Sequence, residues 1–98
     1  MTRKKKSVVY EQQVTIKNRL GLHARPAALF VQLANKFKCD ISVIKDKEEV
    51  NGKSIMGIMM LAAGQGTVLT IRAEGLDGEA AVKAIAELVE ANFGEVEI

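Results

Sequence analysis

The sequence has few of the residues that build metal sites, disulfides and base-stacking surfaces. Among 98 residues it contains one cysteine, one histidine, no tryptophan, three phenylalanines and one tyrosine. A single cysteine excludes a disulfide within the chain, and with a single histidine it supplies too few ligands for a zinc cluster. We therefore expect no metal and no cofactor. Because so few aromatic rings offer little surface on which bases can stack, we also expect no nucleic-acid partner.

Long apolar runs are missing too. No stretch reaches the roughly 20 apolar residues of a membrane span, and the basic start is not followed by the apolar segment of a secretory signal. We expect a cytoplasmic protein without membrane insertion. The composition, 48% hydrophobic and 27% charged, is typical of a globular protein, and the length fits one domain, which we place at residues 8–98.

The net charge of +2 is unevenly distributed. Residues 1–7 carry four basic side chains, and residues 8–98 carry ten basic and twelve acidic ones. A short basic segment can contact nucleic acid, but it is more often a solvated and disordered chain end. We interpret residues 1–7 as a disordered tail. The alternative, a small nucleic-acid-binding domain, predicts salt-dependent retention of DNA or RNA that disappears when these residues are removed.

The only histidine stands where a helix should begin. Pro26 favours the first helical turn, because its ring presets φ and its missing N–H would have had no intrahelical partner. The apolar positions that follow have the spacing of one helical face: Phe30, Leu33, Ala34 and Phe37. We predict a helix from Ala24 to Phe37, with His23 at its N-cap and Gly21 relaxing the loop before it.

A histidine at the N-cap leaves an open helix start. Its ring stands in place of the Ser, Thr, Asp or Asn oxygen that normally accepts from the first backbone N–H groups, so several donors remain at the positive end of the helix dipole. Such an end binds anions, and Arg25 adds a planar fork of donors suited to phosphate oxygens. The helix end also favours the neutral imidazole, which can form a covalent intermediate. We predict a nucleophile and an anion site at one point, although a lone histidine more commonly has only a surface or packing role.

Residue patterns predict four strands and three helices in the order β-α-β-β-α-β-α. The strands are expected at 10–17, 39–44, 49–53 and 67–73, and the helices at 24–37, 54–64 and 77–93. This order favours an α+β fold, a two-layer open-faced β-sandwich whose four-stranded antiparallel sheet is covered on one face by three helices. Cys39 fits a small core residue rather than a reactive thiol. Asp77 is expected to cap the last helix.

The second predicted helix is apolar on nearly every side. Ser54 suits its N-cap and Gly64 suits its C-terminal stop. Because a surface helix needs only one apolar stripe to dock on a core, we expect the surplus to be exposed as a partner surface, and flexible methionines suit repacking against different partners. The alternative is a helix buried on both sides, for which a domain of this size has little room.

The chain resembles the HPr family, the histidine-containing phosphocarriers of the bacterial phosphoenolpyruvate-dependent phosphotransferase system. The resemblance covers about Val14 to Phe93. It rests on Gly-Leu-His-Ala-Arg-Pro-Ala at 21–27, Asn-Gly-Lys-Ser-Ile-Met-Gly-Ile-Met at 51–59 and Gln-Gly-Thr at 65–67. Features of both the sugar-transport branch and the nitrogen-related branch are present, and the sequence does not decide between them.

The resemblance implies that His23 takes a phosphoryl group on Nδ1 from phosphorylated enzyme I and passes it to an enzyme IIA-type acceptor, while Arg25 steadies the phosphate. Ser54 matches the family's regulatory serine, which HPr kinase/phosphorylase modifies in bacteria that have that enzyme. The partner-binding residues implied are Ala24, Ala28, Ile55, Met56 and Met59. The protein would be a phosphocarrier and a monomer, not an autonomous enzyme.

A second interpretation is a regulatory binding module of the same fold, acting through the Ser54 helix on a transcription factor or a metabolic enzyme. His23 separates the two interpretations, because a purely regulatory protein would not need it.

Overall fold

The computed structural model describes residues 8–96, and the tail predicted at residues 1–7 lies outside them. Within this range no helix has both the length and the apolar character to cross a bilayer. The elements follow the predicted order, with a short 3-10 turn added at the end. They are β1 (Val9–Thr15), α1 (Ala24–Ala34), β2 (Asp40–Lys45), β3 (Glu48–Asn51), α2 (Ile55–Met60), β4 (Val68–Glu74), α3 (Gly78–Glu90) and η1 (Asn92–Gly94).

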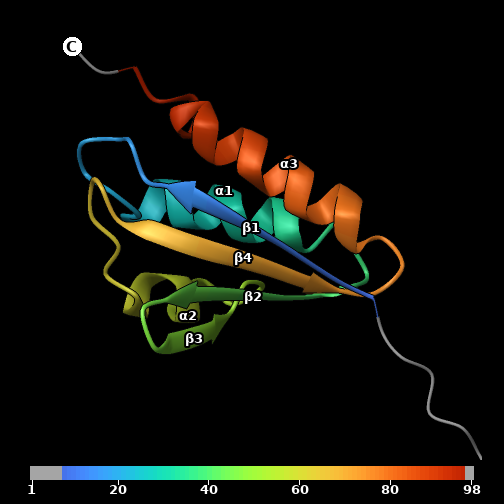
Figure 1. Ribbon diagram of the computed structural model, residues 1–98. Coiled ribbons are helices and arrows are strands. Elements are labelled where there is room, and N and C mark those ends of the chain that lie inside the picture. The colour runs from blue at the N-terminus through green and yellow to red at the C-terminus, as the bar shows by residue number, and fades with distance from the viewer. Residues whose placement is uncertain (1–7, 97–98) are drawn as a thin grey trace, which may run out of the picture.

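The four strands form one antiparallel sheet in the spatial order β1-β4-β2-β3. In the interior strand β4, Leu69, Ile71 and Ala73 are buried, while the alternate residues face the other side. The helices lie together on the buried side of the sheet (Figure 1). This confirms the predicted α+β open-faced sandwich, because period-two alternation in a strand matches a sheet with one covered face.

Two helices close the core over the sheet. Phe30 and Ala34 of α1 and Ile85 and Val89 of α3 are buried, as their helical spacing requires. Cys39 belongs to the same core. Burial, together with the neighbouring Asp77 carboxylate, raises the pKa of the Cys39 thiol to about 11. The thiol is therefore protonated at neutral pH, in agreement with its prediction as a core residue.

The first helix ends three residues earlier than predicted. Asn35 is its C-cap, and the Asn35 side-chain amide donates to the carbonyl oxygen of Val31 at 2.9 Å. The next residues continue as a tighter turn, in which the Lys36 N–H donates to Leu33 and the Phe37 N–H donates to Ala34. The apolar spacing persisted to Phe37, but the backbone had changed to i→i−3 hydrogen bonds, which the spacing does not distinguish.

One more predicted helix boundary and one predicted helix cap were also wrong. The second helix stops at Met60 rather than near Gly64, because Ala62 adopts a left-handed conformation with φ of 48°. Asp77 does stand at the N-cap position of α3, but its side chain makes no cap there. Its carboxylate instead accepts from the backbone N–H groups of Lys38 and Cys39, at 2.8 and 2.9 Å, and so fixes the loop before β2.

Candidate functional site

His23 occupies the N-cap of α1, as predicted. Its φ and ψ of −73° and −174° are extended, its carbonyl accepts from the Ala27 N–H at 3.0 Å, and its side chain makes no capping hydrogen bond. The side chain is 35% exposed. Among residues 8–96 no partner occupies the backbone N–H groups of Ala24 and Arg25. The open helix start inferred from the sequence is therefore present, with an accessible ring beside it.

The loop before His23 is fixed by close backbone packing. Gly21 has φ of 67°, and an added Cβ would overlap the carbonyl oxygen of Ala63. The N–H of the next residue, Leu22, donates to that same carbonyl at 2.9 Å, and the Leu22 side chain is buried. The chain leaving α2 thereby holds the chain entering α1, and glycine is needed for both the dihedral angle and the approach.

Glu95, which no sequence pattern indicated, lies directly against the site. One carboxylate oxygen, Oε2, is 2.9 Å from His23 Nε2 and 3.2 Å from Arg25 Nη1. Arg25 Nη1 also donates to the carbonyl oxygen of Phe93 at 3.2 Å. Because residues 23 and 95 meet only when the end of α3 packs near the start of α1 (Figure 1), no local pattern could have indicated the contact.

The surroundings keep Glu95 ionised. Burial alone would raise its pKa, but hydrogen bonds from Asn18 and His23, together with the charge of Arg25, hold the pKa of Glu95 below its ordinary value. A carboxylate only accepts hydrogen bonds, so the 2.9 Å contact requires a hydrogen on His23 Nε2. In the neutral ring Nδ1 then carries the lone pair, and within residues 8–96 it has no hydrogen-bond partner.

This carboxylate modifies the predicted anion site. The helix amides remain open, but the Arg25 guanidinium already pairs with an anion of the chain itself. Arg25 is about half exposed and has further N–H donors beyond Nη1. An incoming phosphoryl group would therefore share Arg25 with Glu95 or displace the carboxylate.

A second cluster of predicted residues lies on α2. The Ser54 Oγ accepts from the Gly57 N–H at 3.1 Å, which confirms it as the N-cap. Ile58 is fully buried, whereas Met56 is 72% exposed. Other large apolar side chains exposed on α2 and the His23 loop are Ile55, Met59, Met60 and Leu20. The expected surplus apolar surface on α2 is present, and Met60 and Leu20 are exposed apolar residues that the sequence analysis had not singled out as partner-binding.

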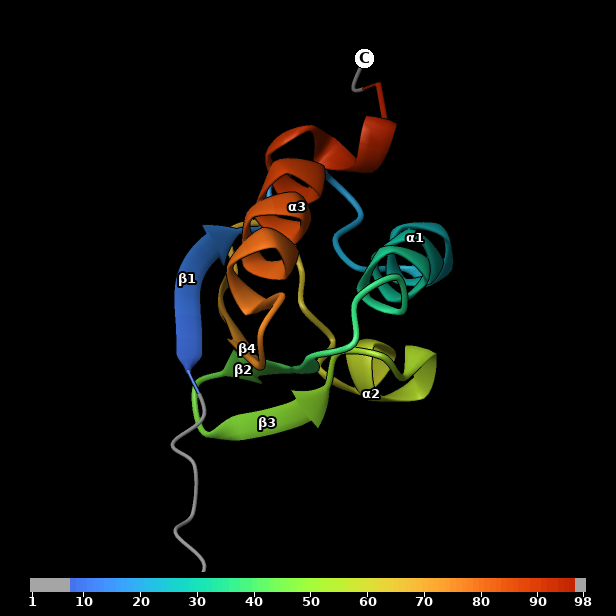
Figure 2. The ribbon, with the colours of Figure 1, turned by 90° about the vertical axis from the view of Figure 1, so that its right-hand side faces the viewer.

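Helices α1 and α2 lie side by side (Figure 2) and run in opposite directions (Figure 1). The chain after α2 bonds to Leu22 at the start of α1, and the Asn35 amide at the end of α1 donates to the Lys53 carbonyl at 3.4 Å. Of the predicted residues on α1, Ala24 is exposed and Ala28 is partly buried. The structure thus brings His23 close to the exit of α2 and leaves Ser54 at the opposite end of α1.

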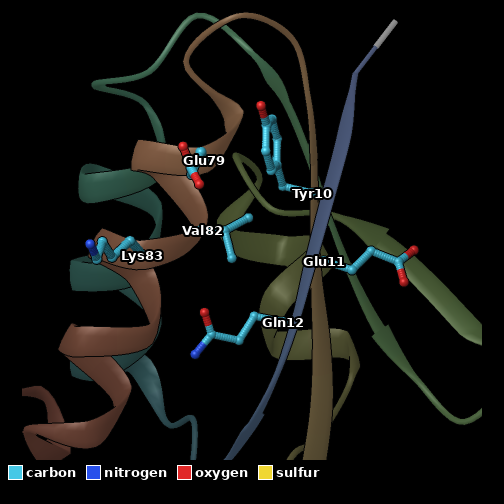
Figure 3. A pocket seen from close by; sticks show the side chains of 6 residues that line it. All are labelled: Tyr10, Glu11, Gln12, Glu79, Val82 and Lys83. Carbon is cyan, nitrogen blue, oxygen red and sulfur yellow. The ribbon is translucent and has the colours of Figure 1, made fainter.

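A separate groove of about 240 Å³ lies between β1 and α3. Figure 3 shows Tyr10 and Gln12 of β1 directed toward α3, where Val82 points toward β1; the side chains of Lys83 and Glu11 point away from each other's element. None of the site residues lines it. Among residues 8–96 no three His, Cys, Asp or Glu side chains are grouped as metal ligands.

The chain is similar to known proteins over most of its length. The family model described as PTS HPr component phosphorylation site matches residues 10–91. The phosphocarrier protein HPr of Neisseria meningitidis is 47% identical over 87 residues, covering 89% of this chain and 98% of that protein. The HPr-like protein Crh of Halalkalibacterium halodurans is 50% identical over 80 residues, covering 82% and 95%. The crystal structure of HPr-C-His from Thermoanaerobacter tengcongensis aligns with a TM-score of 0.87 at 56% identity, covering 90% of this chain and 99% of that one.

Proposed function

The chain belongs to the HPr family of phosphocarriers of the phosphotransferase system, and on that basis we propose that His23 accepts a phosphoryl group on Nδ1 from phosphorylated enzyme I and passes it to an enzyme IIA-type acceptor. Members of this family are carriers rather than catalysts with turnover of their own. The observation that supports His23 is its position: an accessible ring at an open helix start, with Nε2 held by a carboxylate and Nδ1 unpartnered among residues 8–96.

The phosphoryl transfer to His23 needs no general base from this chain. The Nδ1 lone pair forms the new N–P bond while the bond between phosphorus and the donor's leaving atom breaks. Nδ1 carries no hydrogen, so no proton has to leave it. The ring becomes cationic because Nε2 keeps its hydrogen, and the Glu95 carboxylate at 2.9 Å stabilises that charge.

Arg25 supports the proposal through its charge and reach. Its guanidinium lies beside the same carboxylate that contacts the ring, at 3.2 Å. A planar cation with several donors matches the oxygens of a phosphoryl group, and the open amides of the helix start add to that attraction. We assign Arg25 to stabilisation of the bound phosphate.

We define the docking face as Ala24, Ala28, Ile55, Met56 and Met59, the surface offered in turn to donor and acceptor. Exposed methionines repack readily against different partners, which a carrier with two partners requires. Ser54 borders this face, and we assign it to regulatory phosphorylation by HPr kinase/phosphorylase in a host that has that enzyme. A phosphate there would place negative charge beside the apolar face and weaken docking.

Incubation with enzyme I and labelled phosphoenolpyruvate tests the assignment. Label on a histidine is acid-labile and base-stable, so the wild-type protein should acquire label with that behaviour. His23→Ala should acquire none, while Ser54→Ala should still be labelled. Labelling of folded His23→Ala, or acid-stable label on the wild type, would exclude His23 as the acceptor.

A further inference from the structure

Asn18 is a buried polar residue that the proposed transfer does not yet use. It lies in the loop between β1 and α1 and is 0% exposed. Its amide nitrogen donates to the carbonyl oxygen of Gly21 at 2.7 Å and to Glu95 Oε1 at 3.1 Å. Both partners are acceptors, so the orientation of the amide is fixed. Its carbonyl oxygen, Oδ1, is buried without a partner within residues 8–96.

An unpartnered buried oxygen lowers the stability of the fold, and so does the chain turn that delivers Glu95. Asn92 and Phe93 both have φ of 55°, in the left-handed region, which asparagine tolerates but which is unfavourable for a bulky residue such as Phe93. The Glu95 carboxylate joins both unfavourable features, because it follows the turn at residues 92–93 and accepts from the amide of Asn18. Glu95 Oε1 accepts from Asn18, and Glu95 Oε2 accepts from His23 and Arg25.

We propose that Asn18 is a positioning residue for phosphoryl transfer, which through Glu95 fixes the hydrogen on His23 Nε2 and leaves Nδ1 as the nucleophile. The amide holds Oε1, so the carboxylate cannot rotate away, and Oε2 stays directed at the ring. The second amide hydrogen ties the same group to the loop that carries His23. This role rests on the proposed function, but the protonation of the ring can be measured without any transfer.

The test is the substitution Asn18→Asp, which preserves shape but replaces the donor with a carboxylate that repels Glu95. Nitrogen-15 chemical shifts of the neutral His23 ring report which nitrogen carries the hydrogen. We expect the wild type to hold it on Nε2 and Asn18→Asp to give a mixture of both forms. Single-turnover phosphoryl acceptance should fall roughly tenfold to a hundredfold, the range expected from a misdirected nucleophile. Asn35→Asp, the same chemical change at an exposed position at the far end of α1, is the matched control and should leave both readouts unchanged.

The double variant N18D/E95Q separates positioning from mere structure. A glutamine at 95 can donate to the new carboxylate and still accept from His23 Nε2, so the ring should return toward the wild-type form and acceptance should recover in part. If Asn18→Asp leaves the ring and the rate unchanged, the proposal is wrong. If the double variant shows no recovery, Asn18 acts only on the Gly21 loop, and the proposal is again wrong.

Should Asn18→Asp fail to fold, the uncharged Asn18→Ser carries the same test, since serine is too short to reach Glu95. The two proposals fail in different ways. If the wild type holds the hydrogen on Nε2 but accepts no phosphoryl group, only the carrier function is contradicted. If the wild type accepts the group but Asn18→Asp leaves the position of the ring hydrogen unchanged, only the positioning role is contradicted.

Discussion

Replacing Gly21 with alanine should destabilise the whole domain, because this glycine lies where the backbones before α1 and after α2 meet. Alanine at φ of 67° costs about 1–2 kcal/mol relative to an ordinary conformation. The added Cβ would also overlap the Ala63 carbonyl and lie 2.7 Å from the Cα of Gly64. Overpacking of this kind costs about 1–3 kcal/mol, so the combined loss is about 2–5 kcal/mol. For a domain of this length the melting midpoint should fall by about 10–25 °C.

Substitutions at two nearby glycines, Gly64 and Gly66, separate the cost of the dihedral angle from the cost of the overlap. Gly66 has φ of 89° and open space around an added Cβ, so Gly66→Ala should show the dihedral cost without the overlap. Gly64 has open space and no positive φ, so Gly64→Ala should be neutral or stabilise slightly by restricting the unfolded chain. The expected order of midpoints is therefore Gly64→Ala, then Gly66→Ala, then Gly21→Ala.

Thermal and urea unfolding followed by circular dichroism measures this order, and phosphoryl acceptance below the lowest midpoint measures its consequence for His23. Gly21→Ala should accept more slowly even when fully folded, because relief of the overlap has to move the loop that carries the ring. Equal midpoints for Gly21→Ala and Gly64→Ala would refute the argument that this approach of backbones sets the loop.

Three further outcomes follow from the same structure. Ser54→Asp should slow acceptance from enzyme I mainly by raising the KM for the carrier, and an unchanged KM would contradict docking as its mechanism. Cys39 should react with iodoacetamide many times more slowly in the native protein than in urea, because its thiol is buried with a pKa near 11; rapid native alkylation would contradict that burial. The pKa of Glu95 is lowered in the folded state, so its stabilising contribution is present above the ordinary glutamate pKa and is lost as pH falls through the lowered value. The difference in unfolding free energy between the wild type and Glu95→Gln should therefore narrow in acid, and a difference independent of pH would show that ionisation of Glu95 contributes nothing.

Local patterns were sufficient for the elements but not for the contacts between them. The proline at position 26 and the spacing after it predicted where α1 begins, since both act within one or two turns. The exposed surface of α2 was likewise predictable, because a helix apolar on every side cannot be wholly covered in a small domain. The end of α1 was missed because a tight turn preserves apolar spacing while changing the hydrogen bonds, and the end of α2 was missed because nothing in the sequence indicated the left-handed conformation of Ala62.

The contacts that shape the site join residues far apart in the sequence. Glu95 reaches His23 only because the end of α3 returns to the start of α1, and the positioning role proposed for Asn18 depends on its contact with Glu95. Asp77 resembled a helix cap in the sequence, yet its carboxylate holds the loop at Lys38 and Cys39 instead. A short polar side chain can satisfy whichever backbone donors the fold brings near, and its own neighbours in sequence do not identify them.

The antiparallel pairing of α1 and α2 constrains how a phosphate on Ser54 could affect His23. The Leu22 loop meets the exit of α2, and Asn35 meets Lys53 beside Ser54, so the two sites lie near opposite ends of α1. Eleven residues of α-helix span about 16 Å. That separation is about twice the distance of about 8 Å over which salt screens exposed charges in cells, so the phosphate's direct field at the ring is weak. Between the two sites lies the docking face proposed above, which a partner bound at His23 would cover. Regulation from Ser54 should therefore act on partner affinity, leaving the intrinsic reactivity of the ring unchanged.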